Sequence, residues 1–149
     1  HVIKGYLNRE EATAESIIEG WLRTGDMARK DEDDFIFIVD RIKDMVLRGG
    51  ENIYCAEVES ASFNHSDVAE CTVFGVADDR LGEEVGVALL LKSDSKITAD
   101  ELRVHCANSL AKFKIPRYFW FMEEALPRNA SGKFLKKDLR DSLKIGDSY

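Results

Sequence analysis

The fold of this sequence is best inferred from one run, Val85-Gly86-Val87-Ala88-Leu89-Leu90-Leu91. The run is nearly all apolar, so it lacks the alternation of a strand with one wet face. A short apolar run of this kind is typical of a strand whose two faces are both covered. We therefore expect a sheet with other elements packed on both of its faces.

Helix and strand patterns alternate around this run. The predicted elements are a helix over 56–64, a strand over 71–76, the quoted strand, a helix after Thr98, a strand over 118–122 and a helix over 134–143. Thr98 and Glu101 form a capping box, which marks the start of their helix. This alternation predicts an α+β fold with a small mixed three-stranded sheet covered by helices.

A β-hairpin is expected before this sheet. Phe35-Ile36-Phe37-Ile38-Val39 is strongly β-prone. Met45-Val46-Leu47 either pairs with it or forms the next strand. Composition breaks near Asp40-Arg41, so we predict an irregular segment over 1–40 and a domain over 41–149. Because the first residue is not Met, we expect the sequence to be a piece of a longer chain.

The bulk composition excludes several classes of function. The net charge of −7 and the pI near 5.0 disfavour a nucleic-acid partner, which would select a basic face. The three cysteines are isolated, so we expect buried thiols rather than a metal site, and a cytoplasmic protein. The longest apolar run is too short for a transmembrane segment.

Three polar runs carry the functional signal. They are Gly20-Trp21-Leu22-Arg23-Thr24-Gly25-Asp26, the stretch from Asp40 to Ile53 with Gly49-Gly50 inside it, and Pro127-Arg128-Asn129-Ala130-Ser131-Gly132-Lys133. Each alone is a common loop. Together, in this order and spacing, they resemble the closing third of an adenylate-forming enzyme, the family of acyl-CoA synthetases, luciferases and the adenylation domains of peptide synthetases. The resemblance extends from about Gly5 to Leu143.

The resemblance implies what the two parts of the chain are. Residues 1–40 would be the C-terminal end of a large adenylate-binding domain, incomplete here, and residues 41–149 its mobile C-terminal domain. The run from Arg48 to Tyr54 is most similar to fatty or aromatic acyl-CoA synthetases.

The resemblance also implies nucleotide-site residues. Lys133 would be catalytic in adenylation, because an ammonium can stabilise the charge that develops on phosphorus and on the attacking carboxylate. Asp26 would accept hydrogen bonds from the ribose hydroxyls of ATP. Arg41 would approach the same nucleotide, and Lys43 would be the hinge on which the C-terminal domain turns.

A second group of residues would serve coenzyme A. The loop with Gly49, Gly50 and Glu51 would line the tunnel for the pantetheine thiol. The basic segment would bind the nucleotide end of CoA through Phe113, Lys114 and Arg117, although a helix C-terminus explains that segment equally well. Glu57 and Glu59 are expected to be structural.

The implied intact enzyme is an ATP-dependent acid–thiol ligase, an AMP-forming acyl-CoA synthetase. It would take ATP, CoA and a small carboxylic acid as substrates, with Mg²⁺, and its main partner would be the upstream large domain of the same polypeptide. No metal ligands are expected in this chain. The family's ATP-binding loop is not in this sequence, so we expect the isolated chain to be inactive. The alternatives are an adenylation domain that loads a carrier protein and a non-catalytic binding module.

Overall fold

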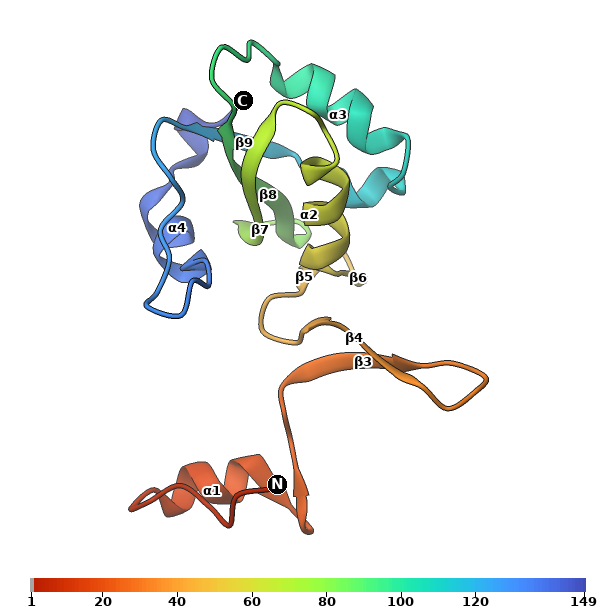
Figure 1. The fold of residues 1–149 in the computed structure, drawn as a ribbon, viewed down its shortest axis with the longest axis vertical. Helices are drawn as coiled ribbons and strands as arrows, with labels where there is room; N and C mark the ends of the chain where they lie inside the picture. The colour runs from red at the N-terminus through yellow and green to blue at the C-terminus, as the bar shows by residue number, and fades with distance from the viewer. Residues whose placement is uncertain (1) are drawn as a thin grey trace. The chain divides into compact units, whose positions relative to one another are not determined.

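A computed structural model describes residues 2–149 and divides the chain into two compact units (Figure 1). The first unit ends at Lys43, and the second runs from Asp44 to Tyr149. The sequence places its boundary slightly earlier, at Asp40-Arg41. That the two parts belong to a large domain and a mobile domain stays a prediction.

The first unit consists of short elements. They are α1 (Glu10–Ser16), β1 (Ile17–Ile18), β2 (Trp21–Leu22), β3 (Asp26–Lys30) and β4 (Ile36–Arg41). The strands pair antiparallel as β1 with β2 and β3 with β4, which confirms the predicted hairpin. None of residues 2–43 is buried, and the β4 side chains of Ile36 and Ile38 are 71% and 67% exposed. Residues 2–43 therefore form no hydrophobic core of their own.

The second unit contains the core sheet. Its elements are β5 (Val46–Arg48), β6 (Glu51–Ile53), α2 (Cys55–Phe63), β7 (Val68–Asp78), β8 (Gly82–Leu91), α3 (Ala99–Ala107), the 3₁₀ turn η1 (Lys112–Lys114), β9 (Tyr118–Met122), α4 (Lys136–Ser142) and the 3₁₀ turn η2 (Ile145–Asp147). The strand order is β6-β5-β8-β7, and β9 pairs parallel with β8.

The α+β class and the mixed sheet are confirmed, but the sheet has five strands instead of the predicted three. The difference arises because β5 pairs with β6 in a hairpin and reaches β8 through the single pair Arg48↔Gly82. Val46-Leu47 therefore belongs to the five-stranded sheet of the second unit and is not paired with β4. The pairing of Arg48 with Gly82 joins residues 34 positions apart, so it leaves no local pattern in the sequence.

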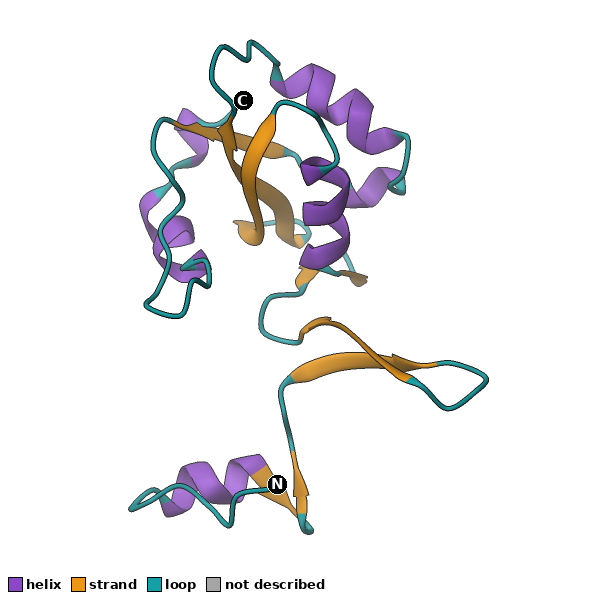
Figure 2. Ribbon diagram, viewed as in Figure 1, coloured by secondary structure: helices purple, strands orange, loops and turns teal. Residues whose placement is uncertain are grey.

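Both faces of β8 are covered, as the apolar run over 85–91 predicts. Val85, Val87 and Leu89 lie in one buried cluster, which also holds residues of α2 and α3. Ala88, between them, lies in a second cluster with Leu139 of α4. Figure 2 shows the helices on both sides of these strands. The alternation along β8 thus divides its apolar side chains between two helical layers.

The ends of the helices depend on local hydrogen bonds. The capping box is present at the start of α3, where Thr98 Oγ1 accepts from the Glu101 amide and the Glu101 carboxylate accepts from the Thr98 amide. The predicted helix over 134–143 is shorter than expected. It begins at Lys136, because Phe134 forms an isolated antiparallel bridge with Arg128.

The cysteines are free and buried, as expected. Burial raises the pKa of the Cys71 thiol to about 12, which makes it unreactive at neutral pH. Among residues 2–149, no helix has the length and apolarity to cross a bilayer.

Candidate functional site

Lys133 lies in a tight loop that is closed by its own polar groups. The Asn129 carboxamide oxygen accepts hydrogen bonds from the amides of Ser131 and Lys133, each at 3.0 Å. The Asn129 amide donates to the Lys133 carbonyl, and Gly132 has a φ of +80°. Positive φ favours glycine, so Gly132 is the residue that allows this turn. The Lys133 side chain is exposed, and its ammonium forms no salt bridge with the described residues.

Side chains outside the loop hold both of its ends. Before the loop, the Glu70 carboxylate of β7 accepts from the Leu126 amide at 2.9 Å and from Arg128 Nη2 at 3.0 Å. After it, Lys136 Nζ lies 2.9 Å from Glu59 Oε1 of α2. Burial alone would lower the pKa of Lys136, but nearby acidic groups, Cys55 and Glu59 first, raise it. Lys136 therefore stays charged.

Asp26 and Arg41, the predicted nucleotide residues, face each other across the β3–β4 hairpin. They are directly paired in the strand register, and Arg41 Nε lies 3.4 Å from Asp26 Oδ1. The Asp26 side chain keeps 28% of its surface exposed. Gly25, before it, has a φ of +77°, a backbone conformation that favours glycine. This arrangement leaves a carboxylate at the surface with a cation beside it, so its oxygens can accept hydrogen bonds from a ligand.

Lys43, the predicted hinge, is the last residue of the first unit. It is exposed and lies in a turn between β4 and β5. A long charged side chain at such a place needs no buried partner, which suits a residue that stays solvated in more than one conformation.

Gly49 and Gly50 form the two-residue turn of the β5–β6 hairpin, between the paired residues Arg48 and Glu51. Both glycines have positive φ, +58° and +89°, as a type I′ turn requires. The Gly49 amide donates to the Leu81 carbonyl at 2.8 Å, and a Cβ on Gly49 would lie 3.1 Å from the Leu81 side chain. The glycine turn therefore lies against the β7–β8 turn, with open space at Gly50.

Glu84 connects this turn with Arg117 of the basic segment. Its buried carboxylate accepts from Arg48 Nε at 2.6 Å and Nη2 at 3.0 Å, and from Arg117 Nη1 at 3.3 Å. Burial opposes ionisation of Glu84, but the hydrogen bonds and charge of Arg48, with those of Arg117, hold its pKa below the usual range. Arg117 remains 53% exposed, so part of its guanidinium faces solvent.

The other members of the basic segment are engaged within the protein. Phe113 is half-buried and packs against the core cluster of α2 and α3. Lys114 Nζ donates to both oxygens of Glu57, at 2.8 and 2.7 Å. The segment itself is a 3₁₀ turn and not the end of an α-helix. The geometry thus brings Arg117 to the glycine turn through Glu84, while Lys114 points to the start of α2.

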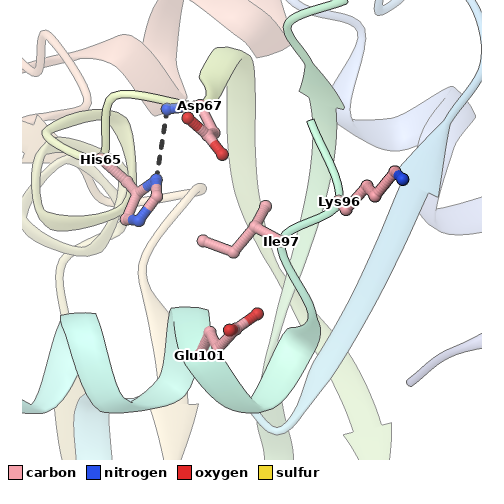
Figure 3. A pocket seen from close by; sticks show the side chains of 5 residues that line it. All are labelled: His65, Asp67, Lys96, Ile97 and Glu101. Carbon is pink, nitrogen blue, oxygen red and sulfur yellow. Dashed lines mark hydrogen bonds between the residues drawn. The ribbon is translucent and has the colours of Figure 1, made fainter. Parts of the chain in front are cut away.

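A surface hollow of about 480 Å³ lies between the α2–β7 loop and the start of α3 (Figure 3). It is lined by His65, Asp67, Lys96, Ile97 and Glu101, none of which the sequence predicts as a site residue. Its carboxylates are engaged by neighbouring groups, such as Ser95 for Asp67 and Thr98 for Glu101. Among residues 2–149, no group of three or more His, Cys, Asp or Glu side chains is placed to hold a metal ion.

Sequence reasoning misses the carboxylates that organise these sites. Glu84 could have been found, because a glutamate directly before the apolar stretch 85–91 is unusual in a strand with both faces covered. Glu70 and Arg128 gave no such signal, since 58 positions separate them. Glu59 was expected to be structural, and its bonds to Lys136, Thr72 and Val73 fit that description.

Comparison with known proteins shows which family this chain matches. Residues 57–133 match the family model of the AMP-binding enzyme C-terminal domain. The chain is 47% identical to a 2-succinylbenzoate–CoA ligase of Bacillus cereus over 140 residues, and 47% identical to that of Bacillus pumilus over 148. These alignments cover 94% and 99% of this chain.

Solved structures of related enzymes match this chain in both fold and sequence. The o-succinylbenzoate CoA synthetase of Bacillus subtilis, in complex with its acyl-adenylate intermediate, matches 97% of this chain with a TM-score of 0.87 and 43% identity. The ATP-bound MatB of Rhodopseudomonas palustris matches 93% of it with a TM-score of 0.86 and 34% identity.

The chain spans less than a third of the length of these relatives, between 28% and 30% of each. The family match covers more than half of the chain and ends at Lys133 itself. The chain therefore belongs to the AMP-binding enzyme C-terminal domain family.

Proposed function

We propose that this chain is the C-terminal part of an AMP-forming acyl-CoA synthetase. The enzyme would activate a carboxylic acid with ATP as an acyl-adenylate, and would then transfer the acyl group to CoA. The observation that carries the proposal is Lys133, a solvent-facing lysine on a rigidly bonded loop within a chain that belongs to the AMP-binding family. The upstream large domain would supply the rest of the active site.

In the first step, adenylation, Lys133 would stabilise developing negative charge. The carboxylate attacks the α-phosphorus of ATP, the bond to the pyrophosphate oxygen breaks, and pyrophosphate leaves. The Lys133 ammonium would stabilise the negative charge that develops on the phosphoryl and carboxylate oxygens. Because no carboxylate of the described chain neutralises this ammonium, its full charge is free for the substrate.

Asp26 and Arg41 would hold the nucleotide during both steps. The Asp26 carboxylate would accept hydrogen bonds from the two ribose hydroxyls, and the neighbouring Arg41 would contact the adenylate. Mg²⁺ would accompany ATP, and in the longer enzyme it would neutralise charge on the departing pyrophosphate. The described residues offer no side-chain cluster for it.

In the second step the glycine turn would replace Lys133 at the reaction centre. A rotation about Lys43 would bring the Gly49–Gly50 turn to the acyl-adenylate. The CoA thiol would then lose its proton to solvent, its sulfur would attack the acyl carbon, and the bond from that carbon to the AMP oxygen would break, so that AMP leaves. The open space at Gly50 supports a tunnel for the pantetheine arm, and the exposed part of Arg117 supports binding of CoA phosphates. Phe113 and Lys114 would take part only by leaving their present contacts.

The acid that fits the comparisons is 2-succinylbenzoate. The named relatives, at 47% identity over nearly the whole chain, are ligases for that acid. A fatty acid has weaker support, for example from the structure of a fatty acyl CoA synthetase of Mycobacterium tuberculosis at 38% identity. We place the enzyme in the cytoplasm, where ATP and CoA are both present.

The test is a coupled assay on the intact enzyme that contains these residues. AMP and acyl-CoA should form together when ATP, CoA and 2-succinylbenzoate are supplied, and fatty acids should react more slowly. Acylation of a carrier protein in place of CoA would favour the alternative of an adenylation domain. If ATP is not converted to AMP with any of these acids, the proposal is wrong. Residues 1–149 alone should give no turnover.

A further inference from the structure

Arg128 connects the Lys133 loop with the rest of the domain. Its Nη1 donates to the carbonyl of Gly132 at 2.9 Å, and its Nη2 donates to Glu70 Oε1 at 3.0 Å. The first bond ends on the residue directly before Lys133, and the second ends on β7. One planar guanidinium therefore joins the tip of the loop to the sheet.

Phe134 contacts both the guanidinium and the backbone of Arg128. The Arg128 guanidinium carbon lies 3.9 Å from the centre of the Phe134 ring, a cation–π distance, and the two residues also form the backbone bridge that closes the loop. Phe134 in turn packs on the buried cluster that holds Leu126 and Leu139. Arg128 is thus held from its face by Phe134 and at its edge by Glu70.

Glu70 serves the same loop in a second way. Its other oxygen accepts from the Leu126 amide at 2.9 Å, so one carboxylate of β7 fixes both the backbone before the loop and the arginine that reaches over it. The Glu70 side chain is 22% exposed and that of Arg128 is 42% exposed, so the carboxylate is the more sheltered partner of this pair. The carboxylate is supplied by β7, a strand at the edge of the sheet, rather than by the loop.

We propose that Arg128, held by Glu70, is a positioning residue for Lys133. The inference rests on the proposed function and names residues that act on adenylation through Lys133 without touching substrate. A lysine stabilises a transition state only if its ammonium is already near the developing charge, and small misplacements cost large factors in rate. The Arg128 fork restrains the Gly132 peptide, and therefore the direction in which the Lys133 side chain leaves the loop.

The kinetic test is Arg128→Met in the intact enzyme, with the two half-reactions measured separately. We expect kcat for adenylation to fall about 10- to 100-fold. The KM for ATP and the rate of thioester formation from supplied acyl-adenylate should stay unchanged. Arg128→Lys should restore part of the rate, because it keeps the charge at Glu70 but loses the fork. Glu70→Gln should resemble Arg128→Met in direction.

A double variant separates positioning from general damage. In a Lys133→Ala background, Arg128→Met should cause no further loss of adenylation, because its effect passes through Lys133. Asp100→Asn is the matched control, since it removes another arginine–carboxylate pair, Asp100–Arg103 on α3, and should leave both half-reactions unchanged. Equal loss in both half-reactions, or a further loss in the Lys133→Ala background, would overturn the inference.

A measurement on residues 1–149 does not depend on activity. Backbone order parameters of Gly132 and Lys133 from ¹⁵N relaxation should fall in Arg128→Met and stay high in Asp100→Asn. Unchanged order in Arg128→Met would also overturn the inference. An unmodified enzyme without ligase activity would instead sink the proposed function, and the order parameters would then decide the positioning role by themselves.

Discussion

At the scale of single residues, the burial of a carboxylate determines whether it can bind a ligand. Glu84 is 2% exposed and shared by two arginines, whereas Asp26 is part-exposed with one arginine at its side. The first is closed to a ligand, because its carboxylate is buried and already accepts hydrogen bonds from both arginines. The second keeps open acceptor positions. Burial thus separates a structural carboxylate from a candidate binding one.

Glu84→Gln should destabilise the second unit. Only the Glu84 side of this ion pair is buried, since the Arg48 side chain is 26% exposed, so removing the carboxylate charge should cost about 1–3 kcal/mol in the free energy of unfolding. Urea unfolding at pH 7 of residues 1–149 measures this loss, with the exposed Glu123→Gln as control.

The loss should depend on pH in a definite direction. The pKa of Glu84 is lowered on folding, so its contribution is present above its ordinary value of 4.5 and is lost as the pH falls through the folded value. The difference in stability between the wild type and Glu84→Gln should therefore be full at pH 7 and shrink below about pH 4.5. A difference that grows on acidification would contradict the paired state of Glu84.

Asp26→Asn should weaken nucleotide binding in the intact enzyme. The amide keeps the shape of the carboxylate but loses the charge and one acceptor, and hydrogen bonds to charged groups contribute about 1.5–3 kcal/mol. The KM for ATP should rise by about tenfold or more. Asp34→Asn, in the turn of the same hairpin at a φ of +69°, is the matched control, because asparagine tolerates that backbone conformation. An unchanged KM would remove Asp26 from the nucleotide site.

At the scale of elements, the β5–β6 hairpin combines a structural role with a candidate functional one. Its strands extend the sheet, and its turn needs positive φ at both glycines. Gly50 has no heavy atom within 4 Å of an added Cβ, so steric conflict inside the domain is not what demands glycine there. Backbone conformation and the approach of a ligand are the remaining reasons.

Gly50→Leu in the intact enzyme should slow thioester formation and spare adenylation. A leucine side chain would occupy the space proposed for the pantetheine arm, whereas Gly50→Asn keeps the turn with a smaller side chain that tolerates positive φ. The comparison of the two variants separates bulk from backbone strain. Gly50→Leu with normal transfer and poor adenylation would contradict the role of this turn.

Local patterns in the sequence predict most of the elements of the second unit. The strand over 118–122 has the predicted bounds, and the capping box at Thr98 starts α3 as expected, because both depend on neighbours in the chain. The place of β5 and β6 in the sheet could not be predicted. It depends on Arg48↔Gly82 and on the bond from the Leu47 amide to Glu83, between residues 34 and 36 positions apart.

In the candidate site, too, local motifs could be predicted from the sequence and long-range contacts could not. The resemblance points to Lys133, Asp26 and the glycine turn one by one, since each belongs to a local motif. It does not show that Asp26 faces Arg41, nor that Arg128 reaches Glu70, because strand register and tertiary packing decide both. The contacts that hold a functional side chain in place come from distant segments, so they were the part that sequence reasoning missed.

At the scale of the whole molecule, the two units differ in what they can do by themselves. Both hydrophobic clusters lie within residues 44–149, and none of residues 2–43 is buried. A chain of about forty residues without a core is not expected to fold alone. Residues 44–149 should therefore unfold in one cooperative thermal transition, and residues 1–43 should give none. Calorimetry of the two separate peptides checks this, and a cooperative transition in 1–43 would contradict it.

The central claim is that Lys133 serves the first half-reaction of a two-step ligase. The most direct measurement compares the two half-reactions of the intact enzyme before and after Lys133→Ala. Adenylation should fall by about two to three orders of magnitude, as for the loss of one preorganised charge. Thioester formation from supplied acyl-adenylate should change little. Equal losses in both half-reactions, or an unchanged rate of adenylation, would contradict the account.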